Sequence, residues 1–160
     1  MKVSKLKMKP VRLVSAGKRD MRTQFGALCW RPRKTGFEVL LITTRRTGRW
    51  AIPKGWPMDG LTPVEAAREE AWEEAGVRGK TSDLCLGVFT YTKILDDGNE
   101  DSLPCMVAVF PMKVTATADT WPESDARKRK WFTPKKAALR IREPELQRIL
   151  LTFNPARLAA

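Results

Sequence analysis

The chain has 160 residues, 42% of them hydrophobic and 30% charged, a balance that suits one domain with a buried core and excludes a disordered chain. It contains no histidine and only three, widely separated cysteines, which excludes Cys/His zinc sites and catalysis by a serine or cysteine paired with histidine. Any catalysis must therefore use carboxylates, lysines, hydroxyls or a metal held by carboxylates. No apolar run reaches the roughly 18 residues of a membrane-spanning helix, and none follows the basic N-terminus as in a secretory signal. We expect a cytoplasmic protein without a membrane partner.

The net charge of +12 is unevenly distributed. Residues 1–22 carry +7 and residues 126–160 carry +8, whereas residues 23–125 carry −3. An acidic centre between basic ends indicates a metal site beside cationic groups that hold a polyanion. For residues 1–20 the alternative is a solvated basic tail.

Runs rich in β-branched and aromatic residues predict strands on both sides of one helix. In chain order these strands are Gln24–Arg31, Phe37–Thr44, Trp50–Ile52, Leu84–Lys93, Cys105–Val114 and Lys130–Phe132. A last amphipathic helix follows, with apolar residues at helical spacing: Leu146, Ile149, Leu150 and Phe153. This order of elements predicts the α+β class or a three-layer arrangement around a mixed sheet.

The helix between the strands has clear start and stop signals. Thr62 can cap it, Pro63 suits its first position, and Glu65 completes a capping box. Gly76 is the residue type expected just after the last turn, at about Ala75. We therefore expect the helix to span about 63–75.

One side of this helix is crowded with acidic residues: Glu69, Glu70, Glu73 and Glu74. Like charges four residues apart each cost the helix roughly 0.2–0.5 kcal/mol. A hard divalent cation such as Mg²⁺ would relieve this repulsion, because it takes oxygen ligands. The pattern thus predicts a metal site, and the alternative is a plain acidic surface.

At these residues the sequence resembles the Nudix hydrolase family, whose pattern is G-x5-E-x7-R-E-U-x-E-E-x-G-U with U aliphatic. The matching positions are Gly55, Glu70, Glu73, Glu74, Gly76 and Val77. Leu61 stands where the pattern has its first glutamate, and Glu69 stands where it has arginine. Two basic stretches, 44–53 and 127–132, are similar to the branch that hydrolyses diphosphoinositol polyphosphates and dinucleoside polyphosphates.

The resemblance implies a Nudix-like α/β/α sandwich, with a central mixed β-sheet flanked by helices, over residues 21–153. Residues 1–20 would be a basic extension and residues 154–160 a C-terminal tail. It also implies a site in which glutamates of the helix hold Mg²⁺ or Mn²⁺, with the backbone near Gly55, and act on the attacking water. The residues so implied are Glu70, Glu73 and Glu74. Glu100 of the loop 96–101 is a further option, for which a solvated hairpin loop is the favoured alternative. The proposed phosphate contacts are Arg22, Arg45, Arg49, Lys54, Lys128 and Arg129.

The expected function is metal-dependent hydrolysis of a phosphoanhydride bond in a polyphosphorylated small molecule, either a diphosphoinositol polyphosphate or a dinucleoside polyphosphate. Two alternatives stay open: a catalytically weak module that binds polyanions or RNA, and a nucleotide or RNA-cap pyrophosphatase. Intact Glu70, Glu73 and Glu74 favour the enzyme, whereas Leu61 and Glu69 keep the binding module open. Nucleic acid is a possible but not a favoured partner, and the sequence leaves the oligomeric state undetermined.

Overall fold

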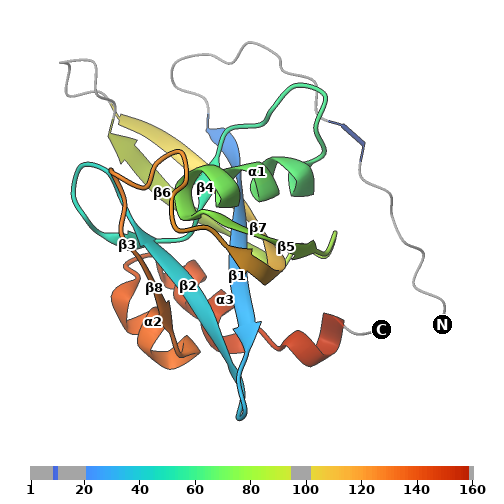
Figure 1. Cartoon of the computed structure of the whole chain (residues 1–160). Coiled ribbons are helices and arrows are strands. Elements are labelled where there is room, and N and C mark those ends of the chain that lie inside the picture. The colour runs from blue at the N-terminus through green and yellow to red at the C-terminus, as the bar shows by residue number, and fades with distance from the viewer. Residues whose placement is uncertain (1–8, 11–20, 95–101, 159–160) are drawn as a thin grey trace.

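The computed structural model describes residues 9–10, 21–94 and 102–158. Within them, an eight-stranded mixed sheet lies between α1 on one face and α2 with α3 on the other (Figure 1). The strands are β1 (Arg22–Pro32), β2 (Phe37–Thr43), β3 (Trp50–Ala51), β4 (Lys54–Gly55), β5 (Val77–Thr81), β6 (Gly87–Ile94), β7 (Ser102–Thr117) and β8 (Arg129–Phe132). The helices are α1 (Pro63–Ala75), α2 (Pro134–Arg140), α3 (Pro144–Thr152) and the 3-10 helix η1 (Pro155–Leu158). The predicted α+β sandwich is confirmed.

The centre of the sheet is the parallel pair of β1 and β7. Their register runs from Arg22 opposite Cys105 to Trp30 opposite Lys113. Every other strand pairing within the described residues is antiparallel. The strand order is β3-β2-β1-β7-β5, with β4 paired to β1, β6 to β7 and β8 to β2. The pairing of β4 with β1 brings Gly55 to the middle of the sheet.

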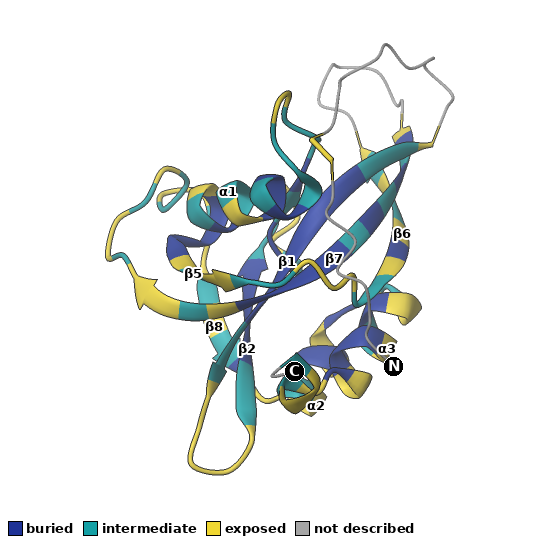
Figure 2. Cartoon of the chain, turned by 90° about the vertical axis from the view of Figure 1, so that its right-hand side faces the viewer, coloured by how far each residue is buried: buried dark blue, intermediate teal, exposed yellow. Residues whose placement is uncertain are grey.

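Successive side chains of the central strands point to opposite faces and fill two hydrophobic cores. The core under α1 includes Phe25, Cys29, Leu40, Ile42, Phe110, Met112 and the helix residues Val64, Ala67 and Ala71. The core under α2 and α3 includes Leu28, Val39, Leu41, Val107, Val109, Leu146 and Leu150. Figure 2 shows these buried positions along the central strands and on the inner sides of the helices.

The helix predicted at 63–75 has those bounds, and Gly76 ends it in the left-handed conformation with φ of 65°. The strand expected from Leu84 begins only at Gly87. The sequence pattern predicts neither β4 nor β5. β5 is rich in glycine and charge, so its pairing with β7 rather than its own composition makes it a strand. All the helices in the described residues fall short of the length and apolar character needed to cross a bilayer.

Candidate functional site

Helix α1 is fixed at its first turn by residues adjacent to it in the sequence. The Glu65 N–H donates to Thr62 Oγ1 at 3.2 Å, and the Thr62 N–H donates to Glu65 Oε1 at 3.0 Å. Pro63 occupies the first helical position. This is the predicted capping box, and it fixes where the helix starts relative to the loop that follows β4.

The side of α1 that faces the sheet carries mostly alanines, so the helix lies close to the strands. As a result Glu70 packs directly on Gly55 of β4. A Cβ atom built at Gly55 would lie 2.2 Å from the carboxyl carbon of Glu70 and 2.2 Å from its Oε1. The Glu70 carboxyl group therefore fills the space that a side chain at position 55 would need, so a larger residue there would displace this carboxyl group.

Glu70 and Glu74 form a hydrogen-bonded pair of carboxyl groups one helical turn apart. The sequence places Glu74 on the polar side of the helix, but in the structure it is only 7% exposed. Burial, and then repulsion from Glu74, raises the pKa of Glu70 to about 8. Burial also raises the pKa of Glu74, against the opposite influence of Arg127 and Lys54. Burial and mutual repulsion thus disfavour two negative charges at this pair, and a bound cation would offset both effects.

The donor set of this pair suits a hard divalent cation. Mg²⁺ commonly binds through one or two carboxylates, while waters and substrate phosphates take its remaining positions. In the described part of the chain, no three acidic, cysteine or histidine side chains gather around one point. The structure thus brings Glu70 and Glu74 together at Gly55, and leaves Glu73 exposed on the same helix. At a two-carboxylate site of this kind, waters and then substrate phosphates would complete the coordination of the cation.

Lys54 connects this pair to a neighbouring cavity. Its ammonium nitrogen lies 4.8 Å from the centre of the Tyr91 ring. Burial lowers the pKa of Lys54, while the carboxylates of Glu74 and Glu143 favour its charged form. Because Glu74 belongs to the carboxyl pair and Glu143 lines the cavity, Lys54 links the two regions electrostatically.

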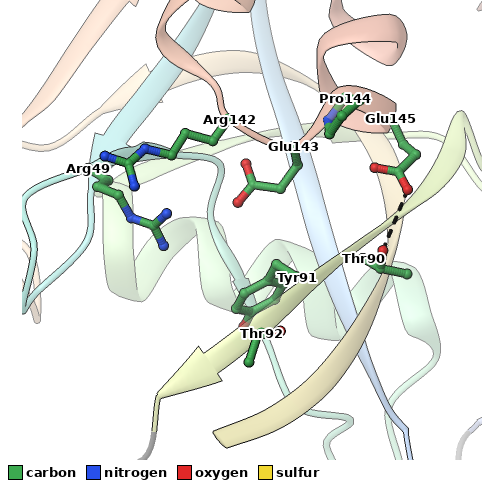
Figure 3. A pocket seen from close by; sticks show the side chains of 8 residues that line it. All are labelled: Arg49, Thr90, Tyr91, Thr92, Arg142, Glu143, Pro144 and Glu145. Atoms are coloured by element: carbon green, nitrogen blue, oxygen red, sulfur yellow. Dashed lines mark hydrogen bonds between the residues drawn. The ribbon is translucent and has the colours of Figure 1, made fainter.

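The cavity has a volume of about 440 Å³ and lies between β6, the segment before β3 and the start of α3. Arg49, Arg142 and Glu143 extend into it from these segments, with Tyr91 at its base (Figure 3). Thr90, Thr92, Pro144 and Glu145 complete its lining. The Tyr91 hydroxyl donates to Gln24 Oε1 at 2.6 Å, which fixes the ring. Two guanidinium groups in one cavity provide the planar donor arrays that bind phosphate oxygens.

Comparison with protein families places this site in a known context. A family model described as the NUDIX domain matches residues 21–153, which covers the whole sheet and both helix layers. The chain belongs to the Nudix family. Members of this family generally use divalent metal ions, in agreement with the oxygen donors of Glu70 and Glu74.

Relatives confirm the resemblance to the named Nudix branch. Nudix hydrolase 12, mitochondrial, of Arabidopsis thaliana is 37% identical over 117 residues, which cover 72% of this chain and 58% of that protein. Diphosphoinositol polyphosphate phosphohydrolase 3-alpha of Mus musculus is 32% identical over 129 residues, which cover 79% of this chain and 73% of that protein. This chain spans 58% to 63% of the length of Arabidopsis Nudix hydrolases 12, 13 and 16.

Solved structures share the fold. The Ap4A hydrolase of C. elegans matches with a TM-score of 0.59 at 20% identity, over 88% of this chain and 100% of that chain. A MutT protein from Methanosarcina mazei Go1 matches with a TM-score of 0.60 at 19% identity, over 89% of this chain and 99% of that chain. At these identities the likeness shows the Nudix fold alone.

The structure gives the predicted basic residues of this Nudix domain different surroundings. Arg49 lines the cavity, whereas Arg45 is largely exposed and forms an ion pair with Glu123 at 3.2 Å. Arg129 donates from Nη1 to the Ala75 carbonyl at 2.7 Å, at the C-terminal end of α1. The Arg129 guanidinium is therefore bound to the C-terminal end of α1, and we do not include it among the candidate phosphate contacts.

Two further predicted contacts lie at strand ends. Lys128 has an exposed side chain just before β8, and its backbone N–H donates to Thr43 Oγ1 at 2.9 Å. Arg22 begins β1 opposite Cys105, with its Nε buried and without a hydrogen-bond partner among the described residues. Neither residue lines the cavity. The acidic loop 96–101 with Glu100 lies outside the described residues.

Sequence reasoning missed four residues of the site: Tyr91, Arg127, Arg142 and Glu143. Arg127 begins the basic stretch 127–132, although nothing local assigns it to Glu74, and no local pattern distinguishes Arg142 from the other basic residues of 126–160. Arg142 is brought to Arg49 by the packing of α3 against β6. Only the fold identifies it as a member of the cavity.

Proposed function

We propose that this chain hydrolyses a phosphoanhydride bond in a polyphosphorylated small molecule, with Mg²⁺ or Mn²⁺ as its cofactor. The observation that carries the proposal is the hydrogen-bonded pair of Glu70 and Glu74 on Gly55, next to a cavity that contains Arg49 and Arg142. Acidic groups that can hold a cation thus lie beside basic groups that can hold phosphates. Both are needed where a charged anhydride is to be cleaved.

The residues have separate roles in this proposal. Glu70 and Glu74, with the Gly55 carbonyl, hold the cation, which neutralises charge on the phosphates when bound. The exposed Glu73 is free to accept a proton from the attacking water as the new P–O bond forms and the anhydride P–O bond breaks. Lys54 lies where it can contact the phosphate that bridges the two regions. We keep Arg22, Arg45 and Lys128 as candidates for outer phosphate contacts.

The cavity favours a substrate with phosphates beyond the scissile bond. Arg49 and Arg142 provide two guanidinium groups, and the Tyr91 ring provides an apolar surface beside them. The names of two matched proteins, a diphosphoinositol polyphosphate phosphohydrolase and an Ap4A hydrolase, describe such substrates. A diphosphoinositol polyphosphate or a dinucleoside polyphosphate is therefore the substrate class we propose.

Phosphate or nucleotide release from a panel of substrates tests the proposal. The panel contains a diphosphoinositol polyphosphate, diadenosine polyphosphates, nucleoside triphosphates and capped RNA, each with and without Mg²⁺ or Mn²⁺. We expect metal-dependent turnover that falls at least 100-fold in Glu74→Gln, as for the loss of a metal ligand. Glu38→Gln is the matched control, because Glu38 pairs with Arg31 on the surface and not with α1.

A second pair of variants tests the cavity. Arg142→Gln should raise KM about tenfold, because one of two guanidinium contacts to the distal phosphates is lost. Arg148→Gln, an exposed change on α3 away from the cavity, should leave KM unchanged. Absence of turnover on every substrate, with the polyanions still bound, would instead favour the binding module.

A further inference from the structure

A cation from a distant part of the sequence contacts Glu74. Arg127 lies in the connection between β7 and β8, and its Nη2 is 3.6 Å from Glu74 Oε1. Its Nη1 donates to the Thr43 carbonyl at 3.1 Å, and its Nε lies 3.5 Å from Glu123 Oε2. Only 12% of its side chain is exposed. The Arg127 guanidinium therefore contacts the end of β2, the last turns of α1 and Glu123 of the β7–β8 connection.

These contacts are not those of a strong stabilising ion pair. The two distances to carboxylate oxygens exceed the usual 2.7–2.9 Å of a charge-assisted hydrogen bond. The Nε of Arg127 is buried and has no hydrogen-bond partner among the described residues. A buried pair of this quality contributes little net stability, because the loss of hydration offsets the attraction. The presence of Arg127 at Glu74 therefore calls for another explanation.

The charge of α1 supplies that explanation. The helix carries no basic residue in its last turn, although acidic side chains at that end are disfavoured by the helix dipole. Glu69 adds a further negative charge at the position where the Nudix pattern has arginine. Positive charge for Glu74 must therefore come from outside the helix, and Arg127 is the cation in contact with its carboxylate, with Lys54 as a second influence.

We propose that Arg127 is a positioning residue for the cation site, and that it replaces the arginine that α1 lacks at position 69. By holding one oxygen of Glu74, it leaves the other oxygen directed to the cation shared with Glu70. This inference rests on the proposed function, since it concerns the same site. It assigns to the β7–β8 connection the guanidinium that the Nudix pattern has on the helix.

Metal affinity distinguishes a role of Arg127 in orienting Glu74 from a purely electrostatic effect of its charge on the cation. A guanidinium beside a cation site repels the cation, so if charge alone mattered, Arg127→Gln would bind metal more tightly. If Arg127 orients Glu74, the same variant binds metal more weakly. We expect the Mn²⁺ dissociation constant of the full chain to rise about tenfold, as for other groups that orient a metal ligand. Mn²⁺ binding is measured without substrate, at a temperature where both proteins are folded.

The matched control is Arg45→Gln. Arg45 pairs with the same Glu123 at 3.2 Å but does not contact Glu74, so its replacement should leave Mn²⁺ affinity unchanged. The rescue variant adds Glu69→Arg to Arg127→Gln, which returns a guanidinium to the helix and should restore most of the lost affinity. In turnover, Arg127→Gln should lower kcat at saturating metal and leave KM unchanged.

Three results would overturn the inference: Mn²⁺ affinity that stays equal or rises in Arg127→Gln, no rescue by Glu69→Arg, or a rise in KM alone. The last would make Arg127 a phosphate contact instead. Failure of the proposed function is recognisable separately, because then the unaltered chain would bind no Mn²⁺ or Glu74→Gln would bind it equally well.

Discussion

The two ends of α1 are held in different ways. At the first turn, Thr62 and Glu65 bond to each other across three residues of sequence. At the last turn, four consecutive carbonyls accept hydrogen bonds from the β7–β8 connection and its flanks, more than 40 residues away. These bonds are Glu123 N–H to Glu73, Trp121 Nε1 to Glu74, Arg129 Nη1 to Ala75 and Ala118 N–H to Gly76, at 3.0, 3.0, 2.7 and 2.8 Å.

This difference separates the contacts that start the helix from the contacts that position the candidate site. The first turn can form from local residues alone, so it fixes where the helix begins. The last turn leaves four carbonyls without partners inside the helix, and here the rest of the fold provides them. Glu73 and Glu74 lie in that last turn. The position of Glu74, one of the two candidate cation ligands, therefore depends on tertiary structure, which the following substitutions test.

The largest loss of stability is expected from Arg129→Met, at the last turn of α1, which residues distant in sequence hold in place. This change removes donors to the carbonyls of Ala75 and Ala118, at 2.7 and 2.5 Å, and a guanidinium 4.0 Å from the Trp121 ring centre. Bonds from charged donors contribute about 1.5–3 kcal/mol each, so we expect a loss of about 3 kcal/mol in the free energy of unfolding, measured by urea denaturation. Lys130→Met, an adjacent exposed change, is the control, and equal losses in both variants would contradict the assignment.

Gly76→Ala should have an intermediate effect. Its φ of 65° alone costs a non-glycine residue about 1 kcal/mol, and a Cβ there would lie 2.6 Å from the Trp121 ring. Gly60→Ala separates the two causes, because Gly60 has φ of 81° and no neighbour within 4 Å of a built Cβ. We expect losses of about 2 and about 1 kcal/mol, respectively, by thermal denaturation. If the losses were the same, Trp121 would not restrict the helix end.

The smallest loss of stability is expected from Thr62→Ala, at the first turn of α1, which neighbouring residues hold in place. Loss of a helix-capping hydroxyl typically costs about 1 kcal/mol. Thr62→Ser keeps the hydroxyl oxygen and should retain nearly all of the stability in the same urea titration. Because Glu74 lies in the last turn and Glu70 is held against Gly55 in the middle of the helix, Mn²⁺ affinity should be unchanged in both variants. A fall in affinity for Thr62→Ala would mean that the two ends are not independent.

The same contrast between local and distant contacts explains how much of the fold and of the candidate site the sequence predicts. The bounds of α1 follow from Thr62, Pro63 and Gly76, because each acts on its own neighbours. The Nudix pattern also identifies Gly55 and Glu70, which the structure shows in contact. These features are local or belong to one continuous motif, so a single sequence reveals them.

The burial of Glu74 could not be predicted in this way. The helical period assigns it to the polar side, and only the β7–β8 connection, which contacts the end of α1, removes it from water. Arg142 joins Arg49 for a similar reason, since the docking of α3 decides its place. In each case the deciding contact joins residues far apart in sequence, which no local pattern encodes.

The parallel pairing of β1 with β7 also bears on how the chain is made. Residues of β1 meet partners that are synthesised about 80 positions later, and the β7–β8 connection emerges after those. During translation the corresponding edge of β1 stays unpaired, and such an edge is open to association with other chains. Pairings this distant in sequence also slow folding. The surroundings of the candidate cation ligand Glu74 are therefore completed late, once the β7–β8 connection has been synthesised.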